Sequence, residues 1–151
     1  MKAYTDGACR GGNPGDCSCS FLVLDEKGGL IHLASRYLGP SLHSNNYAEY
    51  AGLIDLLEWA DRSKITGIEI YCDSALIVNQ TNGEWRVNED SLRPLRALAT
   101  FFLLRGGHTL EHIKGHSGIP GNEMADRLCN AILDAEEVKL VNAGRVVSDV
   151  V

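Results

Sequence analysis

The sequence predicts an α/β domain with a five-stranded mixed sheet, three strands antiparallel and two parallel, and helices on both faces. Three strand-like segments with short connections come first, at 2–6, 20–25 and 31–38. Short connections imply antiparallel neighbours. Two further strand-like segments, 67–72 and 108–114, are separated by helical patterns and therefore need crossover connections. The element order is βββαβααβα, with no internal repeat or linker in the 151 residues.

Four helical patterns occupy the rest of the expected domain, at 46–61, 74–81, 91–104 and 120–137. The first is apolar on two sides, which indicates a helix inside the core. Asn82-Gly83 and Gly106-Gly107 end the second and third patterns. We divide the chain into a domain at 1–137 and a C-terminal tail at 138–151. The tail is rich in valine and leucine, so we expect part of it to dock on the domain or to pair with a sheet edge.

Composition predicts an ordinary globular protein, with 44% hydrophobic and 23% charged residues. No stretch is apolar and long enough to span a membrane, and the first residues lack the apolar run of a secretory signal, so we expect a cytoplasmic location.

We expect the five cysteines to be reduced, and Cys9, Cys17 and Cys19 match no zinc spacing. The net charge of −6, taken alone, argues against a nucleic-acid partner.

Four acids are expected near one edge of the sheet. Asp6 and Asp73 each end a predicted strand, and the carboxyl ends of parallel neighbours meet at one edge, where ligands bind. Glu49 lies on an inward, apolar face of the first helix, and Asp126 lies in the first turns of the last helix. Simpler interpretations stay open: Asp73 as a helix N-cap, Glu49 in a capping box with Asn46, and Asp126 as a favourable charge near a helix N-terminus.

Four neighbouring carboxylates repel one another unless a cation neutralises them. Ligand sets made only of carboxylates favour hard ions such as Mg²⁺ or Mn²⁺. Two such ions about 4 Å apart activate a water and stabilise the leaving oxygen in phosphodiester cleavage. The acids therefore predict a metal-dependent phosphodiesterase.

Four motifs carry these acids: Asp6-Gly7-Ala8 with Asn13-Pro14-Gly15, the segment from Ser44 to Tyr50, Cys72-Asp73-Ser74, and the segment from Lys114 to Asp126. In this order, over about 1–133, they resemble the motifs of type 1 ribonuclease H. The resemblance implies the ribonuclease H-like fold and an endonuclease that cuts the RNA strand of RNA–DNA hybrids, leaving 5′-phosphate and 3′-hydroxyl ends.

The resemblance also implies a role for each matching residue. Two Mg²⁺ ions, or Mn²⁺ as a substitute, would be held by Asp6, Glu49, Asp73 and Asp126. His116, on a glycine-rich loop, would assist proton transfer and product release. The positions that match hybrid contacts are Gly7, Asn13, Asn45, Asn46 and Asn122. We expect the enzyme to be a monomer.

The chain also departs from the family pattern. Only seven residues separate Gly83 from Ser91, which is typical of the short form without a basic protrusion. Arg10, Arg86 and Lys114 are the candidate phosphate contacts. Two alternatives remain: a catalytically inactive nucleic-acid-binding module, and a DNA nuclease of the same fold superfamily. The complete set of acids with His116 argues against the first, and the Gly-His-Ser-Gly loop with the paired asparagines argues against the second.

Overall fold

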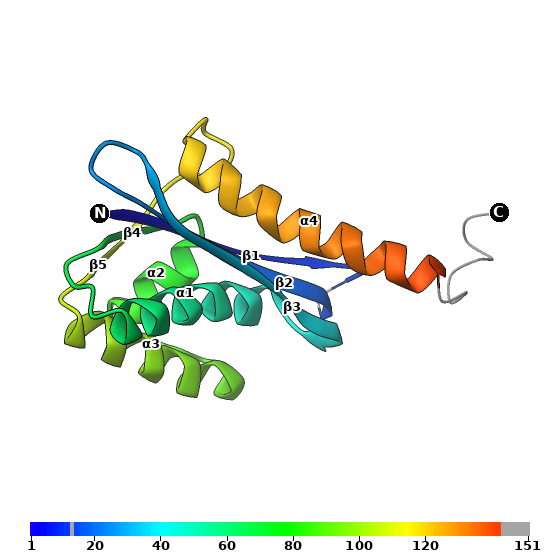
Figure 1. The fold of residues 1–151 in the computed structure, drawn as a ribbon. Coiled ribbons are helices and arrows are strands. Elements are labelled where there is room, and N and C mark those ends of the chain that lie inside the picture. The colour runs from blue at the N-terminus through cyan, green and yellow to red at the C-terminus, as the bar shows by residue number, and fades with distance from the viewer. Residues whose placement is uncertain (13, 143–151) are drawn as a thin grey trace.

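The computed structural model describes residues 1–12 and 14–142. It contains a five-stranded sheet of order β3-β2-β1-β4-β5, with helices on both faces (Figure 1). The strands are β1 Lys2–Arg10, β2 Gly15–Leu24, β3 Leu30–His43, β4 Glu69–Cys72 and β5 Thr109–His112. The first three pair antiparallel, whereas β4 pairs parallel with both β1 and β5. The predicted mixed sheet is confirmed.

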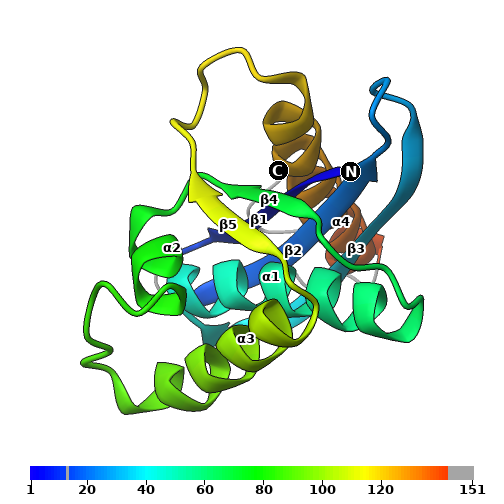
Figure 2. The same ribbon diagram turned by 90° about the vertical axis from the view of Figure 1, so that its left-hand side faces the viewer.

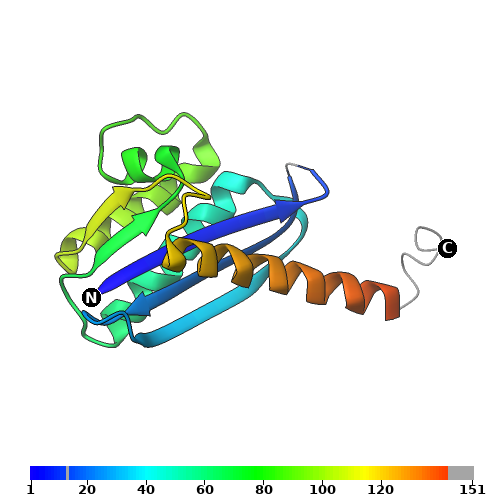
Figure 3. The ribbon, with the colours of Figure 1, turned by 90° about the horizontal axis from the view of Figure 1, so that it is seen from above.

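The helices divide between the two faces of the sheet. They are α1 Asn45–Arg62, α2 Ala75–Thr81, α3 Arg93–Arg105 and α4 Pro120–Asn142, and a short 3₁₀ turn, Asp90–Leu92, precedes α3. The first three helices lie on one face and α4 crosses the other (Figures 1, 2 and 3). The larger core forms between the sheet and α1 and α3, and a smaller one forms beneath α4.

Two element boundaries differ from the sequence prediction. Asp6 does not end its strand, because β1 continues to Arg10 by pairing with β2, where Asp6 lies opposite Ser20. The last helix does not end near 137 but continues to Asn142. Val138, inside it, is 58% exposed. Residues 143–151, most of the predicted tail, lie outside the described residues, so the expectation that the tail docks stays a prediction.

Helix α1 lies directly against the backbone of the sheet. Leu53 and Leu56 are fully buried, as the two-sided apolar pattern predicted. A Cβ atom on Gly52 would lie 2.7 Å from the carbonyl oxygen of Asp6 and 3.1 Å from that of Ser20. Only glycine allows this approach, so Gly52 fixes the height of α1 above β1.

Helix α4 is held on the other face by two serine hydroxyls of β2. Ser18 Oγ donates to the Cys129 carbonyl oxygen at 2.8 Å, and Ser20 Oγ donates to that of Ala125 at 2.6 Å. Both serines are buried, so these bonds also satisfy polar groups that have left water. They fix the position of α4 along the sheet, and with it Asp126, which lies between the two acceptor residues in sequence.

The cysteines differ in part from the expected five thiols. Cys9 and Cys17 face each other in the β1–β2 register and form a disulfide, with Cα atoms 4.0 Å apart. Sequence spacing could not reveal this pair, because it depends on the strand register. Cys19, Cys72 and Cys129 are buried free thiols, as expected.

Within the described part of the chain, no helix combines the length and apolar character needed to cross a membrane.

Replacing Gly52 with alanine tests the close contact between α1 and β1. Alanine is favoured over glycine in a helix by about 1 kcal/mol, so a helix free of such contacts would gain stability. Here the new methyl would overlap two backbone oxygens that cannot rotate away, and we expect Gly52→Ala to lower the free energy of unfolding by about 1–3 kcal/mol. Urea unfolding of both proteins measures this, and a stabilised variant would contradict the contact.

Candidate active site

Asp6 and Asp73 lie at one edge of the sheet, where the parallel pairing of two neighbouring strands ends. The parallel pairing of β1 with β4 ends at Thr5 and Cys72, so Asp6 and Asp73 each follow the last paired residue. Figure 2 shows β4 and β1 side by side in the sheet. The prediction that these two acids meet at one edge is confirmed, although Asp6 lies within a longer strand.

Glu49 reaches the same place from α1. Ser44, not Asn46, is the N-cap of this helix, and its hydroxyl accepts from the Tyr47 N–H at 3.2 Å. The capping-box interpretation of Glu49 is therefore wrong, because the N-cap lies two residues earlier than that interpretation requires. The side chain of Glu49 instead forms a hydrogen bond with Asp6.

Burial and mutual repulsion make these carboxyls hold protons more strongly than usual. Burial, then the charge of Asp73, raises the pKa of Asp6 to about 7 from an ordinary 3.8. Burial, followed by the charges of Asp6 and Asp73, raises the pKa of Glu49 well above its usual range. The three groups therefore act on one another as a single cluster.

The last two predicted groups reach the cluster from the α4 side. Burial raises the pKa of Asp73, and a hydrogen bond from Asn122 opposes this rise. Asp126 raises the same pKa, whereas His116 lowers it, so both lie within electrostatic range of Asp73. All four predicted acids are thus brought together, with Asp126 the most peripheral.

His116 lies on the exposed turn that leads into α4. It adopts a positive φ of 55°, a conformation uncommon outside glycine. Its neighbour Gly115 passes so close to Asp73 that a Cβ there would lie 3.1 Å from Oδ2. The turn therefore runs directly over the acid cluster and presents His116 beside it.

The five predicted hybrid contacts fall in different environments. Asn45 is exposed and Asn46 half-buried in the first turn of α1, where both can face a ligand. Asn122 is 3% exposed and bonds to Asp73, so it orients an acid rather than presenting a surface. Gly7 packs against the backbone of Ala48 and Glu49. Asn13 lies outside the described residues.

Cys72 is a group at the site that sequence reasoning missed. Its Sγ lies 3.6 Å from Glu49 Oε2, and one potential metal-binding atom from each of Glu49, Cys72 and Asp73 lies within 4.8 Å of the other two. The sequence analysis named it only as part of the Cys72-Asp73-Ser74 motif and as one of five cysteines expected to be reduced. Its contact with Glu49 depends on how α1 packs on β4, which no local pattern reveals.

The donor set of the cluster fits a hard divalent cation. Carboxylate oxygens predominate, and their raised pKa values show that the charged forms lack compensation. Among the described residues, Asn122 Oδ1 and Thr5 Oγ1 are buried polar atoms without a hydrogen-bond partner near these acids. A cation with its water shell would supply both positive charge and donors.

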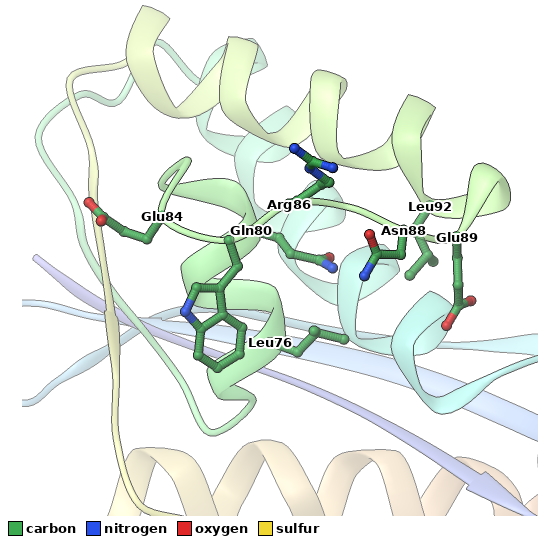
Figure 4. Close-up of a pocket in the computed structure, with 8 residues that line it drawn as sticks. Leu76, Gln80, Glu84, Arg86, Asn88, Glu89 and Leu92 are labelled. Carbon is green, nitrogen blue, oxygen red and sulfur yellow. The ribbon is translucent and has the colours of Figure 1, made fainter.

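A hollow lies next to the site, between α2 and the segment that leads to α3 (Figure 4). Leu76, three residues after Asp73, lines it, and Figure 4 shows Glu84 on one side of the hollow and Asn88 and Glu89 on the other. Arg86 lines this hollow and an adjoining one that Arg96 also borders. This is the region where the sequence is too short for a basic protrusion.

Comparison with known proteins identifies the family. A family model described as RNase H matches residues 1–133. Ribonuclease HI of Halobacterium salinarum is 36% identical over 136 residues, which cover 89% of this chain but only 64% of that relative. Ribonuclease H of Jannaschia is 36% identical over 144 residues, covering 87% of this chain and 89% of that protein.

The chain belongs to the ribonuclease H family.

Solved structures of this family have the same fold. The crystal structure of RNase H1 from Halobacterium salinarum gives a TM-score of 0.78 at 34% identity, over 89% of this chain and 97% of that one. LC11-RNase H1 in complex with an RNA/DNA hybrid gives 0.78 at 33% identity, with the same coverage. The chain is a ribonuclease H enzyme, and the acid cluster occupies the carboxyl edge of its sheet.

The raised pKa of Asp6 predicts how metal-free stability depends on pH. Between pH 3.8 and about 7 the folded state holds a proton that the unfolded chain has released, so this group lowers the free energy of unfolding as pH rises through that window. We expect the melting temperature in chelating buffer to be higher at pH 5.5 than at pH 8. Asp6→Asn should reduce the difference and raise the value at pH 8.

Glu111→Gln, which alters an exposed carboxyl on β5, is the matched control and should leave the pH profile unchanged. Calorimetric melting curves across the pH series measure the effect. A wild-type profile that rises from pH 5.5 to pH 8 and is insensitive to Asp6→Asn would contradict the cluster as described.

Proposed function

We propose that this chain hydrolyses the RNA strand of RNA–DNA hybrids by a two-metal-ion mechanism, leaving 5′-phosphate and 3′-hydroxyl ends. The observation that carries the proposal is the convergence of Asp6, Glu49 and Asp73 on one edge of a ribonuclease H fold. A relative of the same fold, LC11-RNase H1, is known in complex with an RNA/DNA hybrid, which supports this substrate class.

The four acids would hold two Mg²⁺ ions, for which Mn²⁺ would substitute. Bound cations of this kind supply an activated water and stabilise the leaving oxygen. Asp6, Glu49 and Asp73 provide the buried part of the ligand set, and Asp126 completes it from α4. Asn122 keeps the Asp73 carboxylate in one orientation by its hydrogen bond.

Other residues would handle the substrate and its protons. His116, exposed on a turn beside Asp73, is placed to transfer a proton and to move as product leaves. Asn45 and Asn46 have amides that can bond to a phosphate or to the 2′-hydroxyl that distinguishes RNA from DNA. We also propose that Asn13 contacts the substrate and that the protein acts as a monomer in the cytoplasm. The catalytic domain is proposed to comprise residues 1–137, followed by a C-terminal tail.

Matched duplexes test the proposal directly. Purified protein is incubated with RNA–DNA, RNA–RNA and DNA–DNA duplexes of one sequence, with Mg²⁺ or with chelator. We expect cleavage of the RNA strand of the hybrid only, and only with Mg²⁺. Cleavage of DNA would indicate the DNA-nuclease alternative, and hybrid binding without cleavage would indicate an inactive binding module.

Substitutions at the site should separate metal ligands from the proton-transfer group. Asp73→Asn should reduce hybrid cleavage to background, because a neutral amide cannot replace a carboxylate that shares the cations. His116→Ala should lower kcat by on the order of 10²–10⁴-fold, the usual contribution of a proton-transfer residue. Single-turnover cleavage measures both, and near-normal turnover by Asp73→Asn would refute the assignment.

Arg86 should contribute to binding rather than to chemistry. It is exposed, lines the hollow of Figure 4, and forms no ion pair with any of the described residues. We expect Arg86→Gln to raise KM, to leave kcat nearly unchanged, and to reduce the salt slope of binding by about 1. Arg62→Gln at the far end of α1 is the control, and an equal effect there would refute a local contact.

A further inference from the structure

We propose that Cys72 is a positioning residue whose thiol orients the Glu49 carboxylate for metal binding. The inference rests on the proposed function, since it requires Glu49 to be a metal ligand. It adds a group that does not itself touch substrate and that acts through its neighbour.

The hydrogen-bond geometry around the sulfur carries the inference. Cys72 is the last residue of β4 and is completely buried. Its Sγ accepts a bond from the Ser74 N–H at 3.5 Å and lies 3.6 Å from Glu49 Oε2. Because the Ser74 amide already donates to the sulfur, the thiol proton is left to point at the carboxylate. Sulfur is large, so 3.6 Å is a bonding distance for a thiol donor.

A carboxylate held from two sides keeps one orientation. The backbone N–H of Gly7 donates to Glu49, and Cys72 approaches Oε2. The carboxylate of Glu49 is therefore anchored on β1 and on β4 at once, and the position of a cation bound to it is fixed between the two strands. Residues that orient metal ligands in this way typically contribute about 10–100-fold to metal affinity.

A second thiol in the same molecule provides a matched control. Cys19 Sγ lies 3.4 Å from Asp55 Oδ2, so it is also a buried thiol beside a carboxylate of α1. Asp55 is bound by Arg36 at 2.7 and 3.1 Å and lies on the β2–β3 side of the helix. Removing this thiol disturbs a comparable contact without touching the acid cluster.

Calorimetric titration of the full chain with Mn²⁺ alone tests the inference without any substrate. We expect Cys72→Ala to weaken Mn²⁺ binding by about tenfold, at the low end of the range for such residues because a thiol is a weak donor. Cys72→Ser, whose hydroxyl is a stronger donor, should restore most of the affinity, and Cys19→Ala should match the wild type. Unchanged affinity in Cys72→Ala, or an equal loss in Cys19→Ala, would overturn the inference.

Glu49→Ala distinguishes this inference from the proposed function. If Cys72 acts through Glu49, adding Cys72→Ala to Glu49→Ala should cause no further loss of affinity. A further tenfold loss in the double variant would show that Cys72 acts independently and would overturn the inference alone. If Glu49→Ala itself leaves Mn²⁺ affinity unchanged, the metal site proposed as the basis of function is wrong.

The frequency of the infrared S–H stretching band reports the hydrogen bond of the thiol directly, and it tests the inference even if Cys72→Ala does not fold. The band of Cys72 is identified by its loss in Cys72→Ser. We expect it to move to higher frequency in Glu49→Ala, where the thiol has lost its acceptor. A band at the same frequency in the wild type and in Glu49→Ala would show that no hydrogen bond joins the two residues, and would overturn the inference.

Discussion

The direct contact between the backbones of α1 and β1 is the constraint on which the site depends. Gly7 on the strand packs against the main chain of Ala48 and Glu49, and Gly52 on the helix packs against the Asp6 carbonyl. Side chains between a helix and a sheet normally keep the two backbones apart, and at that separation a glutamate and an aspartate on the two elements would not meet. Two glycines remove that separation, so Glu49 and Asp6 share a hydrogen bond.

That contact places carboxylates close together and away from water, which destabilises their charged forms. The same packing that brings the acids together also removes them from water, and burial is the largest cause of the raised pKa of each of Asp6, Glu49 and Asp73. Strain of this kind persists only where the surroundings over-determine it. Here the larger core contains Tyr50 and Cys72, the chain neighbours of Glu49 and Asp73, and the hydroxyls of Ser18 and Ser20 hold α4 on the other face of the sheet.

Features that depend on neighbouring residues could be predicted from the sequence, whereas features that depend on long-range packing could not. Strand ends and helical spacing are local, so the meeting of Asp6 with Asp73 could be predicted. The choice of Ser44 over Asn46 as N-cap could not, because both residues can cap a helix. The Cys9–Cys17 disulfide depends on strand register. The Cys72–Glu49 contact could not be predicted either, because it depends on how α1 packs on β4, two elements far apart in sequence.

The distribution of charged groups bears on how a chain of negative net charge would bind an anionic substrate. Arg10, a candidate phosphate contact, is bound by Asp134 at 2.5 Å and by Glu137 at 3.2 Å on α4, so its charge is already compensated. Arg105 is similarly paired with Asp61. Cations held by the acids would therefore supply positive charge at the site, in addition to that of Arg86. Metal and hybrid would then each strengthen the binding of the other, because each removes the repulsion that opposes its partner.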